Sequence, residues 1–326
     1  MILAGDTGGT KTRLALYEHS NGKFIRRQTE TFASPDYPNL QEIIRTFLAK
    51  HRVSVKKACF GVPGPVVNGR AESTNLQWIT DENAIAPAVG IDCVRLVNDL
   101  VATTSSLPFL NPDDLLTLNP GTPSEQATRF GVVAPGTGTG QGFLHKVADQ
   151  FWALPSEGGH TDFAPNTPLE IELLKYLQKK FGRVSIERVL CGPGLVNIYH
   201  FLKDTGVAAE PPALAKRLRE ENPAAVISAT GQSGEFEICA IALDIFASVL
   251  GAEAGDTALT MVTTGGVYLG GGIPPKIIHK LVDGTVVKAF FNKGRLSDFM
   301  KTIPLHVIRD DHAALLGAAY LASRLS

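Results

Sequence analysis

Cysteine is scarce in this 326-residue chain, and its spacing argues against two whole classes of protein. Cys59, Cys93, Cys191 and Cys239 are widely separated and form no C-x-x-C pair. Scattered thiols of this kind are typical of reduced core residues, and they favour neither a disulfide framework nor a zinc site. We therefore expect an intracellular protein, and a cytoplasmic location fits.

Long apolar runs and an excess of one charge are also lacking. No segment reaches about 18 unbroken apolar residues, so we expect no membrane-spanning helix. The first residues lead directly into a motif, so we expect no signal peptide. Thirty-one basic and 32 acidic residues give a formal net charge of -1, which offers no general attraction to nucleic acid or to anionic membranes. The length suggests two domains.

Strand and helix signals alternate along the chain and predict an α/β architecture. The Asn21-Gly22 pair predicts a hairpin turn, and the apolar spacing of residues 40–49 predicts a helix capped by Asn39. We expect strands at 2–5, 13–17, 23–31, 58–62, 94–97, 129–134, 142–147, 151–154, 267–269 and 305–308. We expect helices at 40–49, 100–107, 169–181, 185–190, 194–202, 235–263 and 313–325, and a polar loop at 155–168.

Three glycine-rich turns follow predicted strands, at residues 6–12, 136–140 and 270–272. Glycines let the backbone approach an anion, and amides and hydroxyls supply the donors. Asp6 adds a carboxylate that could hold Mg²⁺ directly or through water. Neither the Walker A pattern nor G-x-G-x-x-G is complete. Any one of these turns alone can be an ordinary hairpin, but three beside apolar strands favour phosphate binding.

Asp99 follows Asn98 at the end of a predicted strand. A carboxylate in that position can take the proton of an attacking hydroxyl. It can equally be the N-cap of the helix that begins at Leu100, and the residue pattern alone favours the cap.

Residues 157–162 form a polar cluster in a predicted loop. Glu157 accepts hydrogen bonds and His160 can donate them, so the pair can orient a ligand with many hydroxyls. A metal site is the alternative, although the HExxH spacing and supporting cysteines are absent; a solvated loop is another. Nothing local distinguishes Glu187 from a surface helix residue.

Together these segments resemble the bacterial-type glucokinases of the hexokinase/actin/chaperone ATPase superfamily. Asp6-Thr7-Gly8-Gly9-Thr10 resembles their D-x-G-G-T phosphate motif. The other similar segments occur in the family's order: Val97–Asp99, Ala134–Gly138, Leu154–Pro165, Glu187–Asn197 and Thr264–Ile273. Ser156 stands where glycine is common in the family. The clustered-cysteine zinc motif typical of the related repressor/open-reading-frame/kinase (ROK) family is absent.

The resemblance implies a two-domain actin/hexokinase-like (ribonuclease H-like) α/β fold with a ligand cleft between the domains. The small α/β domain would comprise residues 1–108 plus 310–326, and the large α/β domain residues 109–309. The implied activity is transfer of the γ-phosphate of ATP, with Mg²⁺, to the 6-hydroxyl of glucose in glycolysis.

The resemblance also assigns roles to single residues. Asp99 would be the catalytic base, and the sugar would be bound by Asn98, Asp99, Glu157, His160 and Glu187. Mg²⁺ would be held by Asp6, possibly through water. The nucleotide would be bound by Asp6, Thr7, Gly8, Gly9, Thr10, Lys11, Thr137, Gly138, Gly270, Gly271 and Gly272.

Other functions remain open on the sequence. One is a hexose kinase of broader specificity, and another is a non-catalytic sugar-binding regulator. Such regulators usually carry a helix-turn-helix ahead of the first strand, which here begins at Ile2. An ATPase of the chaperone or acyl-phosphate kinase type would share the phosphate turns but not the Glu157 and His160 cluster. We expect a homodimer; residues 204–234 match no segment of the family.

Overall fold

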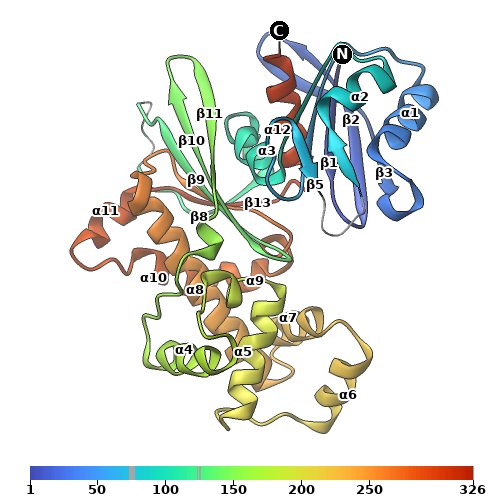
Figure 1. The fold of residues 1–326 in the computed structure, drawn as a ribbon. Coiled ribbons are helices and arrows are strands. Elements are labelled where there is room, and N and C mark those ends of the chain that lie inside the picture. The colour runs from blue at the N-terminus through green and yellow to red at the C-terminus, as the bar shows by residue number, and fades with distance from the viewer. Residues whose placement is uncertain (73–77, 123, 125, 326) are drawn as a thin grey trace. The chain divides into compact units, whose positions relative to one another are not determined.

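The computed structural model describes residues 1–72, 78–122, 124 and 126–325, which divide into two compact units (Figure 1). The first unit comprises Met1–Asp114, Val147–Pro155 and Asp310–Ser326, and the second comprises Leu115–Lys146 and Ser156–Arg309. The first unit corresponds to the predicted small domain, residues 1–108 plus 310–326, but also contains residues 109–114 and 147–155. These segments group with the first unit because the Phe109 ring packs against Tyr320 and the Phe151 carbonyl accepts hydrogen bonds from Tyr320 and Arg324.

The first unit is built on a five-stranded sheet in the order β3-β2-β1-β4-β7. β4 and β7 run parallel to β1, whereas the first three strands form an antiparallel meander. The strands of this sheet are β1 (Ile2–Thr7), β2 (Lys11–Ser20), β3 (Lys23–Ala33), β4 (Lys57–Val62) and β7 (Cys93–Asn98), with a small β5 (Arg70–Glu72) and β6 (Ile79–Asp81) hairpin apart from it. The helices are α1 (Leu40–His51), α2 (Glu82–Val89), α3 (Asp99–Ser106) and α12 (Ala313–Ser323).

Alternate residues of β1 point to opposite faces of this sheet, so each face has its own apolar core. Leu3 belongs to the core that α1 covers, together with Phe47. Ala4 belongs to the core under α12, together with Ala318. Alanines make up much of this second core, which lets α12 and α3 pack closely over the sheet (Figure 1).

The second unit combines a mixed sheet with a helical region. The sheet order is β11-β10-β9-β12-β13-β8, with bounds β8 (Leu115–Asn119), β9 (Arg129–Pro135), β10 (Thr139–Val147), β11 (Gln150–Ser156), β12 (Val267–Leu269) and β13 (Leu305–Ile308). Most of β11 lies within Val147–Pro155, the segment that groups with the first unit. Its helices are α4 (Pro168–Phe181), α5 (Gly192–Asp204), α6 (Pro212–Glu220), α7 (Pro223–Ser233), α8 (Glu237–Met261), α9 (Ile278–Leu281), α10 (Thr285–Phe291) and α11 (Ser297–Thr302).

Helix α8 is the central element of the second unit, with α5, α7 and α10 packed around it (Figure 1). Gly251 lets the α10 backbone approach, since a Cβ there would lie 2.2 Å from the Val286 carbonyl oxygen. α8 is long and apolar enough to cross a membrane, but most of its apolar stretch is buried inside the unit. It is therefore built as a core helix.

Most predicted elements are present, with shifted ends, and Asn39 caps α1 by accepting from the Glu42 N–H. The predicted helix 185–190 is wrong, because only Ile186–Arg188 form one 3₁₀ turn. The unmatched segment 204–234 holds α6 and α7, each with proline near its first turn. The sequence analysis also missed α2 and β8, which are only eight and five residues long.

The crossing of α12 over α3 generates a prediction. A Cβ on Gly317 would lie 1.7 Å from the Ala102 carbonyl oxygen. We expect Gly317→Ala to lower the free energy of unfolding by about 2–3 kcal/mol through overpacking. Helix propensity alone would raise the free energy of unfolding by up to about 1 kcal/mol, so the sign of the change shows whether overpacking dominates. Urea unfolding measures the change. Ala314→Ser, a partly buried position on the same helix, is the control and should change stability little.

Candidate functional site

The turn between β1 and β2 carries the first predicted phosphate site, and it is fixed by hydrogen bonds within the first unit. The Gly8 N–H donates to the Lys11 carbonyl (2.9 Å), and the Ser34 N–H donates to the Thr10 carbonyl (3.1 Å). The Ser34 hydroxyl also donates to the Gly8 carbonyl (2.7 Å). Among the residues that the structure describes, the buried Thr7 hydroxyl has no hydrogen-bond partner. This hydroxyl is suited to meet a ligand oxygen.

Asp6 precedes this turn and lies opposite Arg13 in the antiparallel pairing of β1 with β2. Burial, together with the nearby Asp99 carboxylate, raises the pKa of Asp6 to about 6, although Arg13 opposes that rise. Arg13 also donates to the Asp311 carbonyl (2.8 Å) and pairs with its carboxylate (3.2 Å). The turn is thus surrounded by charged groups from both ends of the chain.

Asn98 and Asp99 stand at the end of β7, where α3 begins. The prediction that Asp99 caps this helix needs correction, because Asn98 is the N-cap and accepts from the N–H groups of Leu100 (2.9 Å) and Val101 (3.4 Å). Asp99 is the first helical residue, and its Oδ1 also accepts from the Leu100 N–H (2.8 Å). The Asn98 amide donates to the Gly64 carbonyl (3.1 Å), so both ends of that side chain are held.

Asp6 and Asp99 lie at the same edge of the first sheet. β1, β4 and β7 are parallel, so their carboxyl ends meet there. Gly61 on β4 pairs with Asp6 in register, and a Cβ on Gly61 would lie 3.4 Å from the Asp99 Cα. The missing side chain lets α3 begin close to β1, which brings the two carboxylates into electrostatic range of each other.

The second unit holds the predicted polar cluster, residues 157–162, which together with Ser156 we call the sugar loop (residues 156–162). Gly158 and Gly159 are fully buried, whereas Glu157 and His160 are exposed. A Cβ on Gly159 would lie 1.9 Å from the Thr139 carbonyl oxygen, so the loop rests directly on β10. The buried glycines therefore project the two polar side chains away from the strand.

Glu187 belongs to the same unit and is bound to the second glycine turn. Its Oε2 accepts from the Thr139 N–H (2.9 Å), and a Cβ on Gly138 would lie 2.4 Å from that oxygen. The sugar loop is tied to the segment that carries Glu187, because the Ile186 N–H donates to the Thr161 carbonyl (2.9 Å). The structure therefore brings Glu187, the sugar loop and the turn at Thr137 and Gly138 onto one strand, β10.

The third glycine turn, Gly270–Gly272, lies against the second one. The Gly270 N–H donates to the Val133 carbonyl (2.9 Å), and a Cβ on Gly271 would lie 2.5 Å from the Pro135 carbonyl oxygen. Gly271 also has a φ of +80°, which favours glycine. The two turns thus lie backbone to backbone, with Gly136 and Gly272 adjacent at positions that carry no side chain.

Several site residues were missed from the sequence. Arg13 could have been found by counting the antiparallel pairing of the first two strands outward from the glycine turn between them, which sets Arg13 opposite Asp6. Ser34 carried no local signal, because its role depends on where β3 ends. Glu253, discussed below, stood out only as a carboxylate within the apolar run of α8.

Comparisons with known proteins agree over the whole chain. The glucokinase family model matches residues 3–325. The chain is 40% identical to a glucokinase of Nostoc sp., covering 100% of this chain and 99% of that protein. It is 35% identical to a glucokinase of Salmonella arizonae, covering 97% of this chain and 95% of that one.

Solved structures give the same result for the fold. The crystal structure of a glucokinase from an Antarctic psychrotroph matches with a TM-score of 0.89 at 31% identity, covering 99% of each chain. A ROK family glucokinase from Streptomyces griseus, solved with glucose and AMPPNP, matches with a TM-score of 0.65 at 19% identity. The predicted actin/hexokinase-like α/β class is therefore confirmed. Since one family model and full-length relatives span both units with their glycine turns and carboxylates, the chain belongs to the glucokinase family.

Proposed function

We propose that this protein is an ATP-dependent glucokinase that transfers the γ-phosphate of ATP to the 6-hydroxyl of glucose, giving glucose 6-phosphate and ADP. The observation that carries the proposal is the full-length match to glucokinases, which includes every segment that bears a candidate residue. Phosphate-binding turns alone would fit many ATPases. The sugar loop and Glu187 add the acceptors and donors that a polyol substrate requires.

Asp99 is the proposed general base. It lies at the carboxyl end of a parallel strand, and the Leu100 N–H at the start of α3 donates to its Oδ1, which orients the carboxyl group. The Asp99 carboxylate would accept the proton of the sugar hydroxyl as that hydroxyl attacks phosphorus. Phosphoryl transfer passes through a loose transition state, so holding the hydroxyl in line contributes much of the acceleration.

Glu157, His160 and Glu187 are the proposed contacts of the remaining hydroxyls. Glu157 and His160 are exposed on the sugar loop, and Glu187 is positioned by the Thr139 N–H. A sugar that leaves one buried acceptor unpaired would lose about 1–3 kcal/mol of binding free energy, which is the basis for discrimination between epimers. Asn98 is the remaining proposed contact, although its side chain already caps α3.

The proposed nucleotide contacts are the three glycine turns. Gly8, Gly9, Thr10 and Lys11 would meet the phosphates with backbone and side-chain donors, while Thr137 and Gly138 would contribute further ones. Gly270–Gly272 present backbone without side chains and would lie near the adenosine. The buried Thr7 hydroxyl fits this role, since a bound phosphate oxygen would supply the partner it needs.

Mg²⁺ is the proposed metal, with Asp6 as its protein ligand, directly or through water. The local chemistry fits a hard cation: burial and a neighbouring carboxylate both disfavour the ionised form of Asp6, and a divalent ion would compensate that charge. When bound with ATP, Mg²⁺ neutralises charge on the phosphates.

We also propose that the enzyme acts in the cytoplasm, in glycolysis, and as a homodimer. The scarcity and wide spacing of the cysteines in the sequence fit the first, and the frequency of two-fold homo-oligomers supports the last. Sedimentation velocity would measure the oligomeric state.

Substrate range is the main test of the proposal. Steady-state rates with ATP and glucose, mannose, galactose, fructose or N-acetylglucosamine would be compared by coupled detection of ADP. A clear preference for glucose in kcat/KM is expected. Comparable rates for several hexoses would favour a hexose kinase of broader specificity. ATP hydrolysis at a rate that does not depend on added sugar would favour an ATPase. Sugar binding without ADP formation would favour a regulator.

Asp99→Ala should lower kcat by about 10²–10⁴, because the general base is lost. The KM for ATP should change little. Asp92→Ala, at the exposed opposite end of β7, is the matched control and should behave like the wild type. Glucose phosphorylation near the wild-type rate in Asp99→Ala would remove Asp99 from the mechanism.

Asp6→Asn should lower the activity, because the proposed metal ligand is lost, and should raise the stability of the folded protein at high pH. The folded pKa of Asp6, about 6, lies above its ordinary value of 3.8, so its contribution to stability is complete below about pH 4 and is lost as the pH rises through 6. At pH 8, without nucleotide or Mg²⁺, the variant should be more stable than the wild type by up to about 3 kcal/mol.

Urea unfolding at pH 8 and pH 4.5 measures this difference, which should shrink at the lower pH. Asp36→Asn, an exposed carboxylate of the same unit, should match the wild type at both pH values. A variant at Asp6 that is no more stable than the wild type at pH 8 contradicts the prediction.

A further inference from the structure

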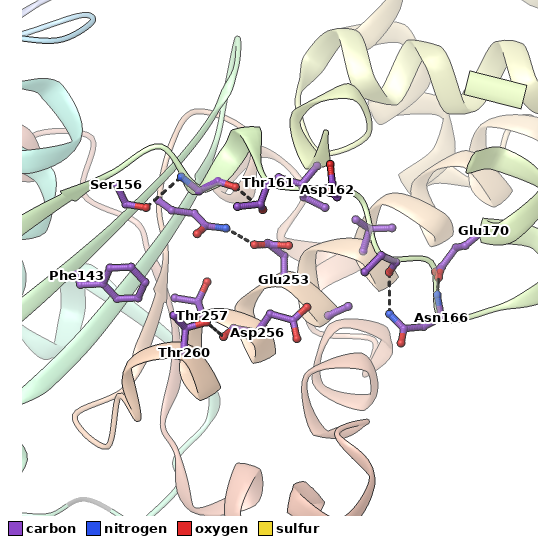
Figure 2. Close-up of a pocket in the computed structure, with 16 residues that line it drawn as sticks. Phe143, Ser156, Thr161, Asp162, Asn166, Glu170, Glu253, Asp256, Thr257 and Thr260 are labelled. Atoms are coloured by element: carbon purple, nitrogen blue, oxygen red, sulfur yellow. Dashed lines mark hydrogen bonds between the residues drawn. The ribbon is translucent and has the colours of Figure 1, made fainter. Parts of the chain in front are cut away.

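A cavity of about 230 Å³ lies behind the sugar loop, within the second unit (Figure 2). Its walls come from β10, from the loop that leads into α4, and from one face of α8. Glu157 and His160 do not line it. The cavity therefore borders the back of the sugar loop, and two of its lining residues, Gln141 and Glu253, connect that loop to α8.

Gln141 is the side chain on which the sugar loop rests. It is 6% exposed, and a Cβ on Gly158 would lie 1.9 Å from its Oε1, so the loop backbone packs directly against the amide. The loop is closed around this contact: the Gly158 N–H donates to the Ser156 hydroxyl (3.0 Å), and the Thr161 hydroxyl donates to the Gly158 carbonyl (2.7 Å).

Glu253 fixes the other end of the Gln141 side chain. Figure 2 shows its carboxylate pointing from α8 toward the sugar loop, where its Oε1 accepts a hydrogen bond from Gln141 Nε2. α8 is the core helix of the unit, so its backbone gives Glu253 a rigid base. A single chain of contacts therefore runs from α8 through two side chains to the buried glycine of the sugar loop.

The other charged groups around this cavity have partners of their own. Asp256 pairs with Lys293 (2.6 Å), and Asp162 pairs with Arg183 (2.7 Å). The fourth carboxylate that lines the cavity belongs to Glu170, which accepts from the Ser248 hydroxyl (2.9 Å) and from backbone N–H groups at the start of α4.

The position of Glu253 lowers the stability of the folded unit, because its surroundings disfavour a charged carboxylate. Burial, followed by the nearby Asp256 carboxylate, raises its pKa to about 7, although the bond from Gln141 and the charge of Lys293 oppose the rise. An apolar residue would fill the space on α8 without that cost. The carboxylate at this position does what an apolar residue cannot, namely hold the Gln141 amide in one orientation.

We propose that Gln141 and Glu253 are positioning residues that hold the sugar loop in the shape that presents Glu157 and His160 to the sugar, an inference that rests on the proposed function. Gln141 sets the height of the loop above β10, and Glu253 sets the orientation of Gln141. The same strand holds Glu187 through the Thr139 N–H, so β10 aligns both groups of sugar contacts. The pair touches neither sugar nor nucleotide.

The test separates positioning from general stability by comparing two substitutions at one site. Glu253→Leu removes the acceptor but fills the space, whereas Glu253→Gln keeps an acceptor for Gln141 and removes the charge. We expect Glu253→Leu to raise the KM for glucose about tenfold, the effect of losing one hydrogen bond to a charged group, with the KM for ATP within about twofold. Glu253→Gln should stay within about twofold of the wild type for both substrates.

Thr260→Ala is the matched control. Thr260 lines the same cavity from the same face of α8, is exposed, and hydrogen-bonds only its own helix among the described contacts. It should leave both KM values unchanged. Thermal melting of every variant shows whether a change in KM accompanies a loss of stability.

A reciprocal exchange keeps the test decisive if Glu253→Leu does not fold. Gln141→Glu places two carboxylates in contact and should raise the KM for glucose, and adding Glu253→Gln restores a donor and an acceptor in reversed order. Recovery of glucose KM in the double variant supports the inference, and the absence of recovery overturns it.

Other outcomes separate this inference from the function on which it rests. A wild-type enzyme that phosphorylates glucose, together with a folded Glu253→Leu variant of unchanged glucose KM, overturns the inference alone. Equal rises in the KM for glucose and for ATP, with a lower melting temperature, show a merely structural role and also overturn it. A wild-type protein that neither binds nor phosphorylates any hexose overturns the proposed function, and this inference with it.

Discussion

Close contact between backbones, where a side chain is missing, is the constraint on which this structure depends. Gly317 lets α12 lie on α3, Gly61 lets α3 begin beside β1, and Gly271 lets the third turn lie on the second. Gly159 lets the sugar loop rest on β10 in the same way. Each contact places a polar group by fixing main-chain positions, and main-chain positions in packed interiors have little freedom to shift. The position of the candidate site therefore depends on glycines that lack side chains as much as on the polar side chains of the site.

The same site retains charges that the fold would be more stable without. Asp6 faces Asp99 in partly buried surroundings, and Glu253 lies in a largely apolar helix. Such groups are common where a ligand supplies the missing compensation, and they lower the stability of the empty protein. Arg13 offsets part of the cost for Asp6, and Gln141 does so for Glu253. In both cases the partner lies on a neighbouring strand or layer, so the packing that buries the carboxylate also supplies the group that partly compensates its charge.

Much of this could be predicted from the sequence, and the remainder has physical reasons. The glycine turns, the helix cap at Asn39 and the strands beside the turns follow from local pattern, since each depends on residues within a few positions. Glu187 gave no local signal because its role depends on a hydrogen bond from Thr139, which is distant in the sequence. Gln141 and Glu253 were missed for the same reason. The residue pattern around Asp99 correctly predicted that a helix begins there, but Asn98 rather than Asp99 is its N-cap.

The packing of α12 has a consequence for synthesis of the chain. Ile2 and Ala4 of the first strand share a core with Leu315 and Ala318 of the last helix. Until the final helix has been made on the ribosome, α3 thus covers that face only in part. The second unit is encoded entirely before that helix, so its core can close earlier. Contacts between such distant parts of a chain form slowly, and apolar strands that wait for them are prone to aggregate. The first unit, although it starts the chain, is the last to complete its fold.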